Sequence, residues 1–238
     1  MMREDSKNTV DNSWIPKTGL GRKVLNGEIT SIKEIFDNGD KIREPQIVDY
    51  LLPELKDEII YLGGVPGKGG GKKRTPVRVT TRMHQSGRKR TLRAFVAVGN
   101  ENGLLGLGYA SGLDARIAIE KAQKKAKLNI MTIRRGCGSW ECSCKGSHSI
   151  PFKMTSKRGA VSVDLIPAPK GMGLVVANEA KKLMKLAGIT DIWSKTRGPT
   201  QTRLNFIMAI MASFEKLNKL KVLEEDKEKV GLIEGIKQ

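Results

Sequence analysis

Residues 77–128 change from a two-residue to a helical hydrophobic repeat, and this change constrains the fold more than any other feature of the sequence. Apolar and polar side chains alternate over 77–84, the pattern of a half-buried strand. Further strands are predicted at 91–99 and 104–109, joined by a turn at 100–103. A helix is then predicted to end near Leu128 after the cap Ser111-x-x-Asp114, with a buried face of Leu113, Ile117, Ala118 and Ala122. This β-β-β-α order predicts an α+β domain at residues 61–130.

A second α+β unit is predicted at residues 131–220. Strands are expected at 130–135, 147–156, 160–167 and 189–195. A helix is expected from Asn178 to Gly188, and a longer one from about Gln201. Apolar residues at helical spacing predict the buried face of the longer helix: Leu204, Ile207, Met208, Met211, Phe214 and Leu217.

The two ends of the chain differ from this middle. Residues 1–60 are predicted to be an extension with short helices, one opened by the capping box Ser31-x-x-Glu34 and closed by Gly39, and one opened by Pro45. Residues 221–238 are predicted to be a charged tail, frayed from Glu224. No apolar run reaches the ~20 residues that a bilayer requires, and the N-terminus lacks an apolar signal region. The sequence therefore predicts a cytoplasmic protein with no membrane contact.

Positive charge is concentrated in the middle of the chain. The 238 residues carry 43 Lys and Arg against 25 Asp and Glu, for a net charge of +18. Residues 61–135 hold 17 basic and 3 acidic side chains, whereas residues 1–60 carry a net charge of −3. Self-repulsion makes such a concentration costly unless a polyanion neutralises it. Because aromatic residues make up only 5%, the composition favours recognition of RNA shape over stacking on single-stranded bases.

The side-chain inventory argues against an enzyme and against a small-molecule substrate. The chain has two histidines, His84 and His148, and no nucleophile–base or carboxylate pair stands out. The Gly/Lys-rich segment 63–76 invites comparison with a phosphate-binding loop. That motif needs Ser or Thr where this chain has Lys73, and glycine where it has Pro66. We interpret the segment as a basic arm along an RNA backbone.

Three cysteines and one histidine form a candidate metal site, and they fall within twelve positions: Cys137, Cys142, Cys144 and His148. Three thiolates and an imidazole can close a tetrahedral zinc site, although the spacing differs from the usual pair of C-x2-C knuckles. Disulfides are not expected in a reducing cytoplasm. Two hypotheses remain open, a structural zinc ion or reduced thiols with His148 packed on RNA. No other cofactor is predicted.

Two long runs of sequence resemble one family. GNENGLLGLGYASGLDARIAIEKAQKKAKLN resembles the first-domain signature of the universal ribosomal protein S-five family. LIPAPKGMGLVVANEAKKLMKLAGITDIWSKTRGPTQT resembles its second domain. RRGCGSW…HSIPFKMTSKRGAVSV resembles the archaeal and eukaryotic branch, and the clustered cysteines indicate the archaeal side. The resemblance covers about residues 58–218.

The resemblance implies a fold and a function. The fold would be a double-stranded-RNA-binding-like β-β-β-α domain followed by the family's β-α-β-α second domain. The protein would be a structural constituent of the small (30S) ribosomal subunit that binds 16S rRNA, lines the channel where mRNA enters and supports translational accuracy. It would pack beside the S-four and S-eight family proteins, using Gly171, Gly173 and Lys181 toward S-four. The alternative is a free-standing double-stranded-RNA-binding or RNA-processing factor.

The residues predicted to bind RNA are the clustered cations, including those of a hairpin loop at 85–90. They are Lys72, Lys73, Arg74, Arg78, Arg82, Arg88, Lys89, Arg90, Arg93, Lys121, Lys124, Lys125, Arg134 and Arg135.

Overall fold

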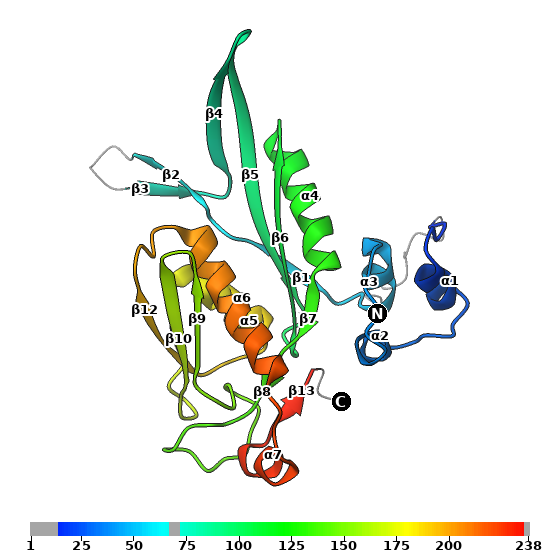
Figure 1. The fold of residues 1–238 in the computed structure, drawn as a ribbon, viewed down its shortest axis with the longest axis vertical. Coiled ribbons are helices and arrows are strands. Elements are labelled where there is room, and N and C mark those ends of the chain that lie inside the picture. The colour runs from blue at the N-terminus through cyan, green and yellow to red at the C-terminus, as the bar shows by residue number, and fades with distance from the viewer. Residues whose placement is uncertain (1–13, 67–71, 236–238) are drawn as a thin grey trace, which may run out of the picture.

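A five-stranded antiparallel sheet forms the centre of the computed structural model, which describes residues 14–66 and 72–235 (Figure 1). Its main path is β1 (Lys56–Ile59), β5 (Gly87–Gly99), β6 (Leu104–Gly112) and β7 (Ile130–Thr132). The fifth strand, β4 (Arg78–His84), pairs with residues 87–93 of β5, while β1 pairs with residues 96–99. Residues 56–59 are therefore part of this sheet, although they lie within the segment expected to be an extension.

Helix α4 (Ala115–Leu128) covers one face of this sheet at unusually close range. Ala118, Ala122 and Ala126 pack on alanines and valines of β5. A Cβ added at Gly108 would lie 1.9 Å from the carbonyl oxygen of Ala122, and one at Gly106 would meet the backbone of Ala126 at 2.3 Å. These β6 glycines therefore let the backbone of the helix approach the strand closely.

The start of α4 corrects two predictions. Ser111 lies in β6, and Asp114 is the N-cap residue without a side-chain hydrogen bond, so the capping box is wrong. Leu113 and Ile117 are 68% and 40% exposed, whereas Ala118 and Ala122 are buried as expected. The buried face follows the small residues because only alanine fits against the glycines of β6.

The second sheet has the strand order β11 (Leu174–Val175), β12 (Ile192–Arg197), β10 (Val161–Pro167) and β9 (Met154–Arg158). Residues 147–153, predicted as the first part of a strand, carry only the isolated bridge between Gly136 and Ser149. Helix α6 (Arg203–Lys219) packs on β9 and β10, and its predicted core residues Ile207, Met211, Phe214 and Leu217 are buried. Leu204 and Met208 are half-buried at the edge of the same core.

The two domains share one hydrophobic core. Phe95 and Leu105, on the face of the first sheet opposite α4, belong to the same buried cluster as Leu183 of α5 (Asn178–Leu186) and Ile207. Figure 1 shows α5 and α6 on this side of β5 and β6. Burial of a side chain such as Phe95 contributes roughly 1.5–3 kcal/mol. The two-domain α+β architecture expected from the sequence is confirmed, with a packed rather than a flexible junction.

The N-terminal helices form a satellite core on the first domain. They are α1 (Gly19–Leu25), α2 (Ile32–Asp37) and α3 (Pro45–Leu51), and they pack against Leu104 and Ile130. The Ser31 hydroxyl accepts a hydrogen bond from the backbone N–H of Lys33, and Gly39 follows α2 with φ +72°. The predicted helix starts at Ser31 and Pro45 are confirmed.

Residues 224–234 include a helix and a short strand, which overturns the prediction that the chain frays from Glu224. Helix α7 (Glu224–Val230) ends at Gly231, whose φ of +61° turns the chain back. Strand β13 (Ile233–Glu234) then pairs with β8 (Arg134–Arg135). Long-range strand pairing holds this segment, and local composition does not reveal such pairing. No helix in the described ranges is long and apolar enough to cross a membrane.

Candidate nucleic-acid interface and metal site

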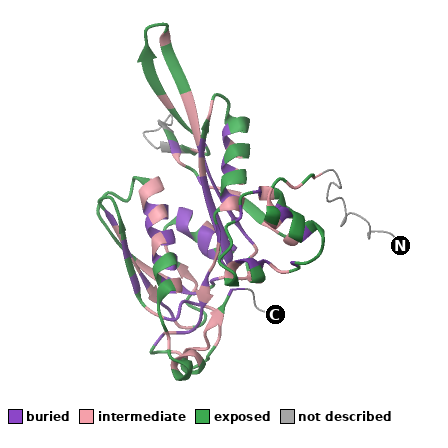
Figure 2. Cartoon of the chain, turned by 45° about the vertical axis from the view of Figure 1, so that its right-hand side comes forward, coloured by how far each residue is buried: buried purple, intermediate pink, exposed green. Residues whose placement is uncertain are grey.

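The hairpin of β4 and β5 extends beyond the body of the protein, and it carries most of the exposed predicted cations (Figures 1 and 2). The turn is only Gln85–Ser86, because His84 already pairs with Gly87. Arg88, Lys89 and Arg90 therefore lie in strand β5 and not in a loop, which corrects the predicted loop at 85–90. Residues 88–90 are three consecutive exposed cations, so no hydrophobic alternation marks this part of the strand.

Cations stand directly opposite cations across this hairpin. Arg78 pairs in register with Arg93, and Arg82 pairs with Lys89. Like charges directly opposite one another destabilise an antiparallel pair. Within residues 14–66 and 72–235, none of the hairpin cations forms an ion pair with a carboxylate. The hairpin thus keeps uncompensated positive charge available for an external anion.

Three further predicted cations, Lys121, Lys124 and Lys125, are exposed on α4. The helix lies beside β6 at the base of the hairpin (Figure 1). Lys127, which was not predicted as a contact, pairs instead with Asp49 of α3. The exposed lysines extend the positive surface from the hairpin along the first domain.

Arg134 and Arg135 lie inside the protein fold. Arg134 donates hydrogen bonds to the carbonyl oxygens of Leu217 and Leu220 and pairs with Glu234 at 3.1 Å. Arg135 is 5% exposed and donates to Asn102 Oδ1 at 2.7 Å. Desolvation by burial lowers the pKa of Arg135 from its ordinary value. Both side chains join the first domain to the C-terminal segment, so the RNA surface proposed below omits them.

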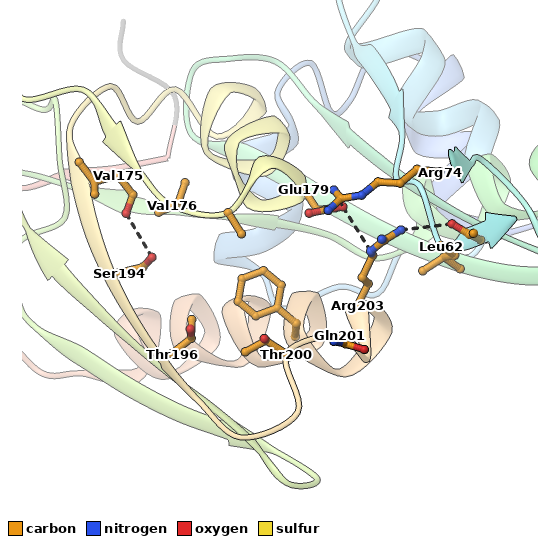
Figure 3. Close-up of a pocket in the computed structure, with 14 residues that line it drawn as sticks. Leu62, Arg74, Val175, Val176, Glu179, Ser194, Thr196, Thr200, Gln201 and Arg203 are labelled. Atoms are coloured by element: carbon orange, nitrogen blue, oxygen red, sulfur yellow. Dashed lines mark hydrogen bonds and ion pairs between the residues drawn. The ribbon is translucent and has the colours of Figure 1, made fainter. Parts of the chain in front are cut away.

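The basic arm is fixed to the second domain by Glu179, a buried residue of α5. Its strands are β2 (Gly63–Pro66) and β3 (Lys72–Thr75), which contain the predicted Lys72, Lys73 and Arg74; residues 67–71 lie outside the described ranges. Glu179 pairs with both Arg74 and Arg203 (Figure 3). Arg203 also donates to the carbonyl oxygen of Tyr61 at 2.7 Å.

These groups line a cavity of about 730 Å³. The predicted contact Arg74 therefore has an intramolecular partner. Sequence reasoning missed Glu179 and Arg203, because nothing in the local pattern relates α5 and α6 to the arm.

The predicted metal ligands come together in space. The ligand atoms of Cys137, Cys142, Cys144 and His148 all lie within 4.8 Å of one another. Cys137 is buried, Cys142 and His148 are half-buried, and Cys144 is exposed with its sulfur 3.2 Å from His148 Nε2. All three cysteines are free. This donor set is the one that structural zinc sites use.

The thiols of Cys137 and Cys142 differ in their readiness to ionise. Burial raises the pKa of Cys137 to about 12. Hydrogen bonds from the backbone of Lys170 and from Cys144 lower the pKa of Cys142 to about 6. A bound cation would favour the thiolate of Cys137, which is otherwise held neutral by its buried position.

Asp191 contacts His148, a member of the cluster, and sequence reasoning did not single it out. Its Oδ2 atom lies 2.9 Å from His148 Nδ1, an ion-pair contact without ideal hydrogen-bond alignment. Burial alone would raise the pKa of Asp191, but hydrogen bonds from Gly173 and Thr190, together with His148, outweigh it and hold the pKa below its ordinary value.

The predicted protein-contact residues lie next to this site. Gly171 and Gly173, with φ of +90° and +75°, shape the turn before β11, and their N–H groups donate to Asp191 Oδ1 at 3.1 and 2.8 Å. Lys181 is exposed on α5. The structure therefore leaves the backbone of the turn and the Lys181 side chain open to a neighbour.

Known proteins match both domains. The family model described as "Ribosomal protein S5, N-terminal domain" matches residues 73–134, and "Ribosomal protein S5, C-terminal domain" matches residues 156–227. Similar chains include proteins named small ribosomal subunit protein uS5. That of Methanocaldococcus jannaschii is 44% identical over 94% of this chain and 96% of its own length. That of Methanothermobacter thermautotrophicus is 46% identical over 92% and 94%, and that of Pyrobaculum calidifontis is 49% identical over 83% and 90%.

These matches show that the chain is a ribosomal protein built from two α+β domains. Nearly the whole length of the relatives is covered, at an identity that establishes common descent. The chain belongs to the ribosomal protein S5 family, as its resemblance to that family had indicated. This family is structural and non-enzymatic.

Proposed function

We propose that the chain is a structural constituent of the small ribosomal subunit in the cytoplasm and that it binds 16S rRNA through the β4–β5 hairpin. The observation that carries this proposal is the cross-strand register that places cations opposite one another, Arg78 opposite Arg93 and Arg82 opposite Lys89. The names of the relatives support the ribosomal assignment.

A phosphate backbone fits this surface better than a protein partner. Phosphate oxygens between opposed cations convert a repulsive pair into two charge-assisted contacts. The residues of the proposed RNA surface lie on β3, the hairpin and α4: Lys72, Lys73, Arg78, Arg82, Arg88, Lys89, Arg90, Arg93, Lys121, Lys124 and Lys125.

The finer functional assignment follows the family resemblance. The protein lines the channel where mRNA enters, packs beside the S-four and S-eight family proteins and supports translational accuracy. Gly171, Gly173 and Lys181 form the face toward S-four. The exposed backbone of this turn is consistent with a protein contact.

We also propose that Cys137, Cys142, Cys144 and His148 hold a structural zinc ion. Support comes from the convergence of their ligand atoms and from the carboxylate behind His148, since metal-bound histidines usually contact a carboxylate or carbonyl through the other ring nitrogen. The ion would fasten the loop 136–149 without taking part in any reaction.

Sedimentation at high salt tests the ribosomal proposal. A structural constituent stays with small-subunit particles after a high-salt wash, because its shape-matched contacts and neighbours persist when surface electrostatics are screened. A free-standing double-stranded-RNA-binding or processing factor washes off. Recovery of the protein only at the top of the gradient would reject the proposal.

A further inference from the structure

Asp191 is placed between the cysteine–histidine cluster and the turn formed by residues 170–173. It follows α5 in a short connection, and it is 4% exposed. One carboxylate oxygen, Oδ2, contacts His148 Nδ1 at 2.9 Å, and the other, Oδ1, accepts hydrogen bonds from the N–H groups of Gly171 and Gly173. A single buried side chain therefore contacts both features.

A second connection joins the same two parts of the chain. The backbone N–H of Ile192, the residue after Asp191, donates a hydrogen bond to the carbonyl oxygen of Gly173 at 3.2 Å. In addition, the carbonyl oxygen of His148 accepts from the backbone N–H groups of Thr190 and Asp191 at 2.9 and 3.1 Å. These backbone hydrogen bonds hold His148 next to the segment that carries Asp191.

The turn depends on these contacts more than on side-chain packing. A Cβ at Gly171 or Gly173 would meet no atom within 4 Å, so neither residue packs against a neighbour. The turn has one internal hydrogen bond, from the N–H of Met172 to the carbonyl oxygen of Pro169 at 3.3 Å. Gly173 also accepts from Ile192 N–H at 3.2 Å. The N–H groups of Gly171 and Gly173 both donate to Asp191 Oδ1.

We infer that Asp191 couples zinc occupancy of the cluster to the conformation of the 170–173 turn. The inference rests on the proposed zinc ion. When Nε2 of His148 is a zinc ligand, Nδ1 must carry its proton, and that N–H can donate to Asp191 Oδ2. The ring then fixes the carboxylate, and the carboxylate fixes the two glycine N–H groups.

Two consequences follow from this coupling. The turn should be well ordered when zinc is bound and more mobile when the metal is removed, although it lies outside the metal loop itself. Because the turn is the proposed contact with a neighbouring protein, the metal would preorganise a binding surface and lower the ordering cost of association. Asp191 acts here as a positioning residue that does not ligate the metal.

Hydrogen exchange on the full-length chain tests the coupling. The chain is prepared with one equivalent of Zn²⁺ and again after chelation, and native mass spectrometry records the bound metal. In the wild type, zinc should slow amide exchange of residues 171–173 about tenfold or more. Asp191→Asn should weaken zinc binding by ~10–100-fold and, at saturating zinc, abolish the added protection of the turn. Asp40→Asn, an exposed carboxylate on the N-terminal extension, serves as the matched control and should behave like the wild type.

The outcomes separate the two proposals. A wild-type chain that binds no zinc rejects the proposed metal site, and the coupling with it. Zinc binding without any change in exchange at 171–173 overturns the coupling alone, as does an Asp191→Asn chain with wild-type protection at saturating zinc. If Asp191→Asn fails to fold, as judged by circular dichroism, the wild-type comparison with and without zinc still decides the coupling.

Discussion

Replacement of Lys89 by Glu should stabilise the free protein and weaken its binding to RNA. Lys89 is exposed and stands opposite Arg82 across the hairpin. Cross-strand charge pairs contribute roughly 0.2–1 kcal/mol, with a sign set by the charges. Conversion of a repulsive pair into an attractive one should raise the free energy of unfolding by about 0.5–1 kcal/mol.

The effect on RNA binding should be larger and opposite in sign. A hydrogen bond to a charged group is worth about 1.5–3 kcal/mol, so the loss of one phosphate contact should reduce affinity about 10–100-fold. The slope of log affinity against log salt should become shallower by about 1, since one fewer counterion is released. Urea unfolding of the free protein gives the first quantity, and fluorescence anisotropy with an rRNA fragment over a salt series gives the second.

Lys23→Glu is the matched control, because it makes the same change in net charge at an exposed position of α1. It should leave the RNA affinity within a few-fold of the wild type. A Lys89→Glu protein that is less stable than the wild type would refute the cross-strand argument. An RNA affinity and salt slope equal to those of the control would refute the hairpin as the RNA surface.

Three other predictions address the fold. Gly108→Ala should lower the free energy of unfolding by about 2–3 kcal/mol through the clash with α4, as measured by urea unfolding, whereas Gly19→Ala, in open space, should change it by less than ~0.5 kcal/mol. Glu179→Gln should speed amide exchange in β3 and leave exchange in α2 unchanged, because the arm loses its ionic anchor. Hydrogen bonds from Thr18, Trp14 and Lys17 outweigh burial and hold the pKa of Glu44 below its ordinary value of 4.5. The ionised Glu44 therefore stabilises the folded protein above pH 4.5, and this stabilisation is lost as the pH falls through the lowered pKa. Amide exchange of residues 14–18 should rise over that acidic range.

Local patterns predicted the elements that local physics determines. The alternation over 77–84 predicted strand β4, but Val79 and Met83 are 56% and 73% exposed, so the expectation of a half-buried strand is wrong. The turn at 100–103 and the apolar face of α6 also follow from residues within a single segment. The cluster of Cys137, Cys142, Cys144 and His148 was also accessible, because its members are close in sequence and chemically distinctive.

Contacts between residues far apart in the sequence could not be predicted from local patterns. Arg135 is one of several basic residues in the sequence, and only the C-terminal strand β13 shows that it is buried. Asp191 lies 43 positions from His148, and Glu179 lies 105 positions from Arg74. In each case a charged residue acquires its role from a contact that tertiary folding creates. Arg88, Lys89 and Arg90 were placed in a loop because three consecutive cations give no hydrophobic repeat, and only their pairing with β4 shows that they lie in a strand.

RNA–protein crosslinking in assembled small subunits tests the central claim most directly. Ultraviolet irradiation followed by mass spectrometry would map the peptides that carry nucleotide adducts. The account predicts adducts on residues 78–93, with the acidic N-terminal segment 14–55 largely unmodified. Adducts concentrated on 14–55, with none on the hairpin, would contradict it.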